Sequence, residues 1–445
     1  MTEPERPFRR LSPLTPLVRG SIFVAAVVFT TWDDLLAGDL GPIGLLLLGV
    51  LAAGAVLGYA SWLRTKYWVE ADELRVDTGV IYQQSRRIRI DRLQGIDIVQ
   101  PFVARLFGLA ELRMDVAGGD REGSLAFLPL VEAQELRELL LARRDAVRRA
   151  GAPEPGDEAA EPALPDWAPP DHDIAALDLS TLVLSMLLSW ETITIVAGAA
   201  VFGAVALATD GALLVPVLPV LGGFVLVQAR RLSAFHGFTV AQTRSGLQVR
   251  RGLLERSTQT IALARVQGVV VSEPLLWRPR DWARLDVSVA GYGKADDAEG
   301  RPAVTTVMPV APRALVLDLA RHLLRGGGEN AEVDLDALAL TPPPHAARWV
   351  DPVSRRFRAA GIGAGLIASR EGWMTRRTHL VRHARVQSLR LSQGPVQRRL
   401  GLADLHVDSP PGPVRVRARH RRADEARALL EQESVLAREA RALSR

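Results

Sequence analysis

The chain has 445 residues, a length that predicts about three domains, and it contains no cysteine. Disulfide frameworks, thiolate metal sites and cysteine nucleophiles are therefore excluded. The formal net charge of +5 and the pI near 10.1 come mostly from arginine. This balance favours an anionic membrane surface as readily as nucleic acid, and a GC-rich genome would produce it as well.

Two apolar stretches lie near the N-terminus. Residues 41–63 carry no charge and are long enough to span roughly 30 Å of hydrocarbon as a helix. Residues 17–32 precede them and end at Asp33 and Asp34. A cleaved signal peptide is the alternative for the first stretch, but no small-x-small cleavage site ends it. We therefore expect a cytoplasmic N-terminus over residues 1–16 and a transmembrane hairpin over residues 17–63.

A second hairpin is predicted over residues 177–229, with helices from 179 to 208 and from 211 to 227 that turn at Asp210. Lysine and arginine flank both hairpins, whereas the tips carry only aspartate. By the positive-inside rule, both tips face outward, and both termini and the soluble parts are cytoplasmic. The sequence thus predicts four spans in a bacterial cytoplasmic (inner) membrane.

Three soluble modules are predicted. Each combines period-two apolar alternation, typical of half-buried strands, with a C-terminal amphipathic helix. The third has no hairpin, because its apolar run from Ala359 to Ala368 is too short to span and is interpreted as its first strand. The proline-rich stretches between modules are predicted to be linkers. The modules cover residues 64–150, 230–325 and 346–445, and the linkers cover residues 151–176 and 326–345.

A fifteen-residue spacing occurs three times, from a glycine to the glutamine of an Arg-x-Gln triplet. A Gly-Leu pair recurs fourteen residues past the glutamine in copies one and three, where copy two has Asp281-Trp282. Repeats of this kind indicate one domain used three times. We interpret the triplet as structural, with the arginine closing a turn or pairing across a sheet; shared ligand binding is the alternative. The repeat residues are Gly79, Arg92, Gln94 and Gly108; Gly252, Arg265 and Gln267; and Gly372, Arg385, Gln387 and Gly401.

This order of hairpin, strand, glycine, strand, Arg-x-Gln, strand, Gly-Leu, strand and helix resembles the bacterial pleckstrin-homology-like (PH-like) domain of the YdbS and YdbT type. The residues that carry the resemblance in copy one are Gly79, Arg92, Gln94, Arg105 to Leu109, and Leu112. The resemblance implies α-helical membrane hairpins plus mainly-β (α+β) modules. These would be three PH-like β-sandwich or barrel domains, each capped by a C-terminal helix.

The resemblance also implies a role. Proteins of this type look like accessory membrane proteins in envelope stress or tolerance of membrane-active toxins. We therefore expect a non-enzymatic membrane-anchored scaffold that forms a homo-oligomer or a complex with a smaller single-domain PH-like membrane protein.

Motifs for chemistry are missing from the sequence: it has no hydrolase elbow, Walker loop, HExxH or Rossmann fingerprint. We expect no enzyme activity, no cofactor, no metal and no nucleic-acid partner, since the basic residues are not interleaved with stacking aromatics. His379 and His383 are predicted to be solvated strand histidines rather than a metal pair.

Two sets of charged residues remain as candidate sites. Glu191 lies within the second apolar stretch and is a candidate intramembrane polar residue, unless the span begins after it. An intramembrane Glu191 would favour a component of a transport or lipid-translocating complex as the alternative function. The candidate contacts for anionic lipid headgroups are Arg415, Arg417, Arg419, Arg421 and Arg422.

Overall fold

The computed structural model forms two compact units. Unit 1 comprises Met1–Pro169 and Leu254–Thr260, and unit 2 comprises Pro170–Leu253 and Ile261–Arg445. The structure describes residues 9–32, 41–70, 73–78, 84–116, 123–150, 172–208, 214–243, 246–290, 306–325, 333–335, 337–409 and 412–443. Several predicted features lie outside these residues: Gly79, the hairpin tips at Asp33, Asp34 and Asp210, and nearly all of the first linker.

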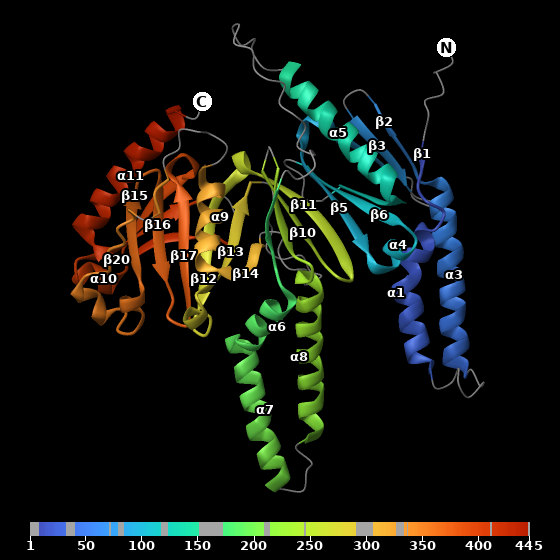
Figure 1. The fold of residues 1–445 in the computed structure, drawn as a ribbon, viewed down its shortest axis with the longest axis horizontal. Coiled ribbons are helices and arrows are strands. Elements are labelled where there is room, and N and C mark those ends of the chain that lie inside the picture. Colours follow the sequence, from blue (N-terminus) through green and yellow to red (C-terminus); the bar gives the residue numbers. More distant parts are fainter. Residues whose placement is uncertain are drawn as a thin grey trace. The chain divides into compact units, whose positions relative to one another are not determined.

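Unit 1 consists of a helical hairpin and one module (Figure 1). A four-stranded antiparallel sheet has the order β1-β2-β3-β4. In a second antiparallel sheet, β6 lies between β5 and β7 and pairs with both. Helix α5 closes the core that contains Leu74, Ile90, Leu112 and Leu140, all fully buried. The elements are α1 (Thr15–Thr30), α3 (Pro42–Arg64), β1 (Arg9–Arg10), β2 (Lys66–Val69), β3 (Glu73–Thr78), β4 (Gln84–Arg89), β5 (Leu93–Pro101), α4 (Phe102–Leu106), β6 (Leu109–Val116), β7 (Gly123–Pro129) and α5 (Leu130–Ala150).

The second module, in unit 2, repeats this plan. Apolar residues of its strands and of α9 form one core, with Phe238, Leu247, Leu285 and Leu323 fully buried. Its elements are β8 (His172–Ala176), α6 (Leu179–Leu187), α7 (Trp190–Ala208), α8 (Leu214–Phe235), β9 (Thr239–Thr243), β10 (Gly246–Arg251), β11 (Glu255–Ala262), β12 (Val266–Pro274), β13 (Trp282–Val289), β14 (Thr306–Pro312) and α9 (Arg313–Arg325).

The third module shares a sheet with the second. Strand β17 pairs with β12, which gives the six-stranded order β14-β13-β12-β17-β16-β15, while β18, β19 and β20 form a separate sheet under α11. The run predicted as one strand, Ala359 to Ala368, instead forms the hairpin β15–β16. Gly365 turns it with a φ of +75°. The elements are β15 (Ala359–Gly363), β16 (Leu366–Glu371), β17 (Thr375–Arg382), β18 (Ser388–Ser392), α10 (Pro395–Arg399), β19 (Leu402–Asp408), β20 (Val416–Arg422) and α11 (Ala423–Leu443).

The repeat residues form the same backbone features in the copies. The triplet arginine is the last residue of a 3-10 turn each time: η1 (Ile90–Arg92), η2 (Leu263–Arg265) and η6 (His383–Arg385). Gly252 and Gly372 have φ values of +107° and +89°, a region that favours glycine. Gly108, Gly401 and the divergent Asp281 have φ values of +67°, +64° and +53°. Aspartate tolerates this left-handed conformation, so the drift in copy two leaves the turn intact.

Each module begins before its hairpin. Strand β1 pairs with β2 across the first hairpin, and β8 pairs with β9 across the second. In module three a single bridge joins Thr341 to Ala360 in the same way. Strand β8 occupies the last five residues of the stretch that we expected to be a linker, and no apolar periodicity marks it in the sequence.

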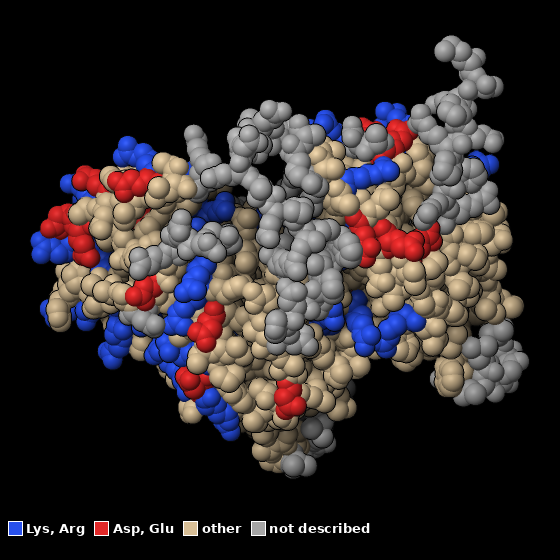
Figure 2. Space-filling model, turned by 45° about the horizontal axis from the view of Figure 1, so that its top comes forward, with Lys and Arg blue, Asp and Glu red and all other residues tan. Residues whose placement is uncertain are grey.

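Two or three candidate spans lie among the described helices, where four were predicted. Gly44–Arg64 of α3 and Val217–Phe235 of α8 are long and apolar enough to cross a bilayer. Helices α6 and α7 count as a third span only if the pair, bent by 56° at the break between them, crosses as one. Helix α1 has 16 residues, fewer than the roughly 20 that a helix needs to cross a bilayer. In Figure 2 the charged residues gather over the modules, and α3 is charged only at Arg64.

Candidate membrane-facing surface

Helix α6, which is separated from α7 by a break, packs on module two. Leu182 of α6 is buried in the module core, and the buried indole Nε1 of Trp277 donates to the Ser185 carbonyl at 3.0 Å. Ser189 accepts from the backbone N–H of Thr192 at 3.2 Å, and Gln228 of α8 donates to the Thr192 hydroxyl at 3.0 Å. Helix α6 therefore lies against the module, and α7 runs beside α8.

Glu191 lies in the first turn of α7. Its carboxylate accepts from Arg231 of α8 at 2.7 Å, and its side chain is 68% exposed within the chain. Arg231 follows the apolar part of α8, where we predicted the cytoplasmic boundary. The 17 residues from Thr192 to Ala208 extend about 25 Å as a helix. Whether the span includes Glu191 or begins after it stays a prediction, because the structure contains no bilayer.

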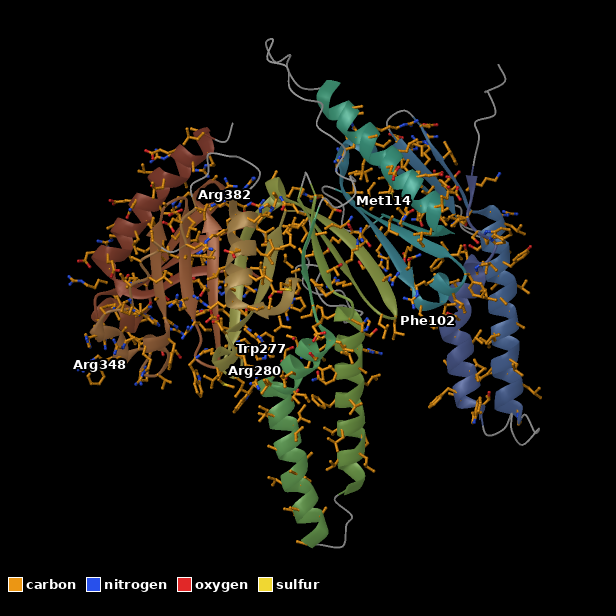
Figure 3. The ribbon with its side chains drawn as sticks, viewed as in Figure 1. Phe102, Met114, Trp277, Arg280, Arg348 and Arg382 are labelled. Atoms are coloured by element: carbon orange, nitrogen blue, oxygen red, sulfur yellow. The ribbon has the colours of Figure 1, made fainter. Side chains whose placement is uncertain are left out.

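A chain of contacts leads from α6 to module three. The short helix η3 (Arg278–Arg280) follows Trp277, and Arg278 donates to the Trp373 carbonyl at 2.7 Å. The Leu275 N–H donates to the Met374 carbonyl at 2.6 Å. Figure 3 shows Trp277, Arg280 and Arg348 at the end of unit 2 from which α7 and α8 extend. The β16–β17 turn thus lies on the hairpin side of unit 2.

Module three carries a short segment where modules one and two carry a hairpin. The segment contains η4 (His345–Trp349) and η5 (Ser354–Phe357), between the Thr341 bridge and β15. The ring centroid of Phe357 lies 6.4 Å from that of Trp373, so η5 contacts the β16–β17 turn. The chain position of a membrane hairpin is therefore filled by two short helices on the hairpin side of unit 2.

This segment and the adjacent turn expose aromatic and basic side chains together. Trp349, Val353 and Trp373 are 70%, 62% and 50% exposed, and the Arg348 guanidinium lies 5.1 Å from the Trp349 ring centroid. Tryptophan and arginine side chains suit the membrane–water interface, because each combines an apolar body with a polar end. We call this surface the aromatic–arginine patch, and it consists of Arg348, Trp349, Val353, Arg355, Arg356 and Trp373.

Unit 1 has a comparable surface beside its own hairpin. Helix α4 exposes Phe102 and Leu106, while its Ala104 is buried against Val18 of α1. Arg105 lies 5.8 Å from the Phe102 ring centroid. In Figure 3, Phe102 is at the end of the module from which α1 and α3 extend. An exposed aromatic beside arginine therefore occurs on the hairpin side of each unit.

The candidate lipid contacts between Arg415 and Arg422 do not form one surface. Arg421 is only 1% exposed and donates to the carbonyls of Thr341, Pro342 and Ala360, so the expectation that it contacts lipid is wrong. Burial lowers the pKa of Arg421, opposed by Glu425. Arg422 pairs with Asp424 at 3.0 Å, and Arg415 is exposed while Arg417 and Arg419 are half-buried.

The two histidines are buried rather than solvated, which corrects the prediction. His383 Nδ1 lies 2.8 Å from Glu433 Oε1, and its Nε2 lies 3.2 Å from the Gly363 carbonyl. The His379 imidazole, 3.7 Å from Glu371, lowers the pKa of that carboxyl to about 2. Among the described residues, no group of three or more His, Asp and Glu side chains is placed to hold a metal ion.

The repeat residues remain near the turns and are not gathered into a site. Arg265 donates to the Ala290 carbonyl of its own module, Gln267 is buried, and Gln387 is exposed. Sequence reasoning did not identify Trp349, Val353 and Trp373, because isolated aromatics carry no periodic signal. Trp349 and Val353 lie at the chain position where the other two copies have a hairpin, and this position could have revealed them.

Comparisons with known proteins agree with this architecture. The family model described as "Bacterial PH domain" matches residues 20–144, 174–326 and 346–434, one match for each module. The chain is also similar to the UPF0699 transmembrane protein YdbT of Bacillus subtilis (strain 168), with 23% identity over 290 residues. That alignment covers 60% of this chain and 57% of the relative, little more than half its length. The chain is thus a membrane protein that belongs to the bacterial PH domain family.

Proposed function

We propose that the protein is a non-enzymatic scaffold whose three PH-like modules are held against the cytoplasmic membrane face, where they assemble with other envelope proteins. Its role would lie in envelope stress or tolerance of membrane-active toxins. The observation that carries the proposal is the replacement of the third hairpin by the aromatic–arginine patch. Every module then has a membrane-directed element at the same chain position.

Short joints between helix and sheet support the proposal. Thr65 alone separates α3 from β2, and the Trp62 indole donates to the Leu11 carbonyl at 2.9 Å across this joint. Three residues separate α8 from β9, and the last of them, Phe238, is fully buried. Modules joined so closely to apolar helices cannot diffuse away from the bilayer.

Charge supplies the attraction for module three. Each arginine close to an anionic leaflet contributes roughly 1 kcal/mol, so Arg348, Arg355 and Arg356 together contribute about 3 kcal/mol. This free energy corresponds to a population shift of about 100-fold. The tryptophans add interfacial contact that does not depend on lipid charge.

The alternative of a transport component depends on Glu191. Arg231, near the end of the apolar helix α8, donates a hydrogen bond to this carboxylate. This ion pair accounts for a charged residue at position 191 without a polar transport path through the membrane. The scaffold proposal accounts for more of the chain.

Lipid-dependent quenching tests the proposal. The chain has no cysteine, so Val353→Cys can be labelled with a polarity-sensitive fluorophore in full-length protein in nanodiscs. We expect nitroxide-labelled lipid to quench this probe, more strongly in anionic than in zwitterionic bilayers. Val435→Cys on α11, a matched exposed valine, should show little quenching. Equal quenching at the two positions would contradict the proposal.

A cellular assay tests the role. A strain that lacks the chromosomal gene should lose tolerance of a membrane-active toxin, and the wild-type chain should restore it. The double substitution Trp349→Ser/Trp373→Ser should restore less tolerance than Trp349→Phe/Trp373→Phe at equal membrane abundance. Full complementation by the serine variant would refute a need for the patch, and unaltered tolerance in the deletion strain would refute the role.

A further inference from the structure

Consecutive modules are joined by one type of strand pairing. In unit 1, residues Ile98–Pro101 of β5 pair antiparallel with Glu255–Thr258, a segment of copy two that belongs to this unit. In unit 2, Gly268–Pro274 of β12 pair antiparallel with Thr375–Val381 of β17. In both cases the strand after one triplet takes the strand before the next triplet as its neighbour.

The register of the two junctions is identical. Pro101, seven residues after Gln94, pairs with Glu255, twelve residues before Gln267. Pro274, seven residues after Gln267, pairs with Thr375, twelve residues before Gln387. Because a slip of one residue would reverse the faces of a strand, this agreement marks a specific interface.

The first and last modules each have one strand without the neighbour that this type of pairing would give it. Strand β18 follows the last triplet and pairs only with β19, and β4 precedes the first triplet and pairs only with β3, in the part of the chain that the structure describes. Strand edges of this kind present unpaired N–H and C=O groups. The common register aligns Ser392 with Gln84 and Leu391 with Ser85.

We propose that the outer edge of β18 binds β4 of a second copy of this chain, so that chains associate head to tail. The inference rests on the proposed scaffold function and names the surface through which the scaffold assembles. Such contacts are heterologous and propagate into rings or open arrays. A second copy supplies the missing strand in the register that the chain already uses twice.

The triplet arginine of module three gives independent support, although Arg265 of module two bonds within its own module. Arg385 donates to the carbonyl of Ala264, a residue of the preceding module, within unit 2. The equivalent Arg92 in the first module ends η1 and is exposed, and its side chain forms no hydrogen bond or ion pair with another described residue. In a head-to-tail contact the Ala384 carbonyl of the second copy is the corresponding acceptor for Arg92.

One charge pair limits the contact. The common register places Arg390 opposite Arg86, and directly opposed like charges weaken strand pairing. The junction between β5 and Glu255–Thr258 stops just before the equivalent position. A contact that stops there as well avoids the repulsion, and within β18 and β4 it comprises Leu391 with Ser85 and Ser392 with Gln84. The association between chains is therefore weaker than the junctions within the chain.

Disulfide trapping tests the register, since the chain has no cysteine. Chains with Gln84→Cys or Ser392→Cys, tagged to differ in size, are co-expressed and oxidised in membranes; Ser85→Cys with Leu391→Cys forms the neighbouring pair. Adjacent antiparallel pairs alternate in Cα separation between about 4.5 and 5.5 Å, so both pairs are tested. The off-register control combines Gln84→Cys with Ser388→Cys. Intrachain pairs at Ile98/Thr258 and Val99/Ser257 control for oxidation.

We expect mixed dimers from the in-register pairs, at least fivefold above the off-register control, and a further increase with Arg390→Glu. Trapping no stronger than the control, while the intrachain pairs oxidise, would overturn the inference. Dimers in which the Gln84→Cys chain links only to itself would also overturn it, because they would show β4 pairing with β4. Lipid quenching at Val353 is independent of this result and separates a failed interface from a failed scaffold proposal.

Discussion

Arg421→Met removes the donors of a buried guanidinium and keeps most of its aliphatic volume. The native side chain donates to the Pro342 carbonyl at 3.1 Å, to the Ala360 carbonyl at 2.7 Å and to the Thr341 carbonyl. An acceptor left unsatisfied in the interior costs about 1–3 kcal/mol. With allowance for relaxation, we expect a loss of about 3–5 kcal/mol, as for other buried groups that lose their partner.

Hydrogen exchange measured by mass spectrometry on the full chain in detergent reports this loss locally. Protection of the β15 and β20 amides should fall by a factor of about 100 or more, since 1.36 kcal/mol corresponds to tenfold. Arg422→Met is the matched control, because Arg422 is 67% exposed and pairs with an exposed Asp424. Surface pairs contribute about 0–1 kcal/mol. Equal protection in the two variants would refute the structural role of Arg421.

Gly372→Ala should destabilise module three by about 1–3 kcal/mol, because φ is +89° and the new Cβ would lie 2.2 Å from the Thr375 carbonyl oxygen. Thermal unfolding measures this loss, and the control Gly394→Ala should change the unfolding temperature little, because its new Cβ has room. Equal effects of the two substitutions would contradict this reasoning. Burial lowers the pKa of His420, so its stabilising contribution is complete above the ordinary value of 6.5 and is lost as the pH falls through the lower folded value. Protection in β20 should therefore fall with pH below 6.5 in the wild type and less steeply in His420→Asn, and parallel profiles would exclude His420 as the cause. Glu191→Gln should change stability in detergent by less than about 1 kcal/mol, since its pair with Arg231 is exposed, and a larger loss would indicate a buried contact.

Local signals in the sequence determined the plan of each module. Gly252 and Gly372 mark turns with positive φ, and the arginine of each triplet is the last residue of a 3-10 turn. Alternating apolar residues form the strands around them. The C-terminal helices α5 and α9 begin directly after Pro129 and Pro312, since proline favours a helix start. These features depend on residues close together in the chain, so spacing is enough to find them.

Tertiary structure alone decided which edges meet and which charges are buried. Arg421 and Arg422 are neighbours with the same chemistry, yet only Arg421 points at carbonyls contributed by residues about 60 to 80 positions away. The pairing of β12 with β17 and the placement of β8 beside β9 across a hairpin join segments separated by dozens of residues. Burial and strand partnership are set by the free energy of such long-range contacts, which no local pattern in the sequence encodes.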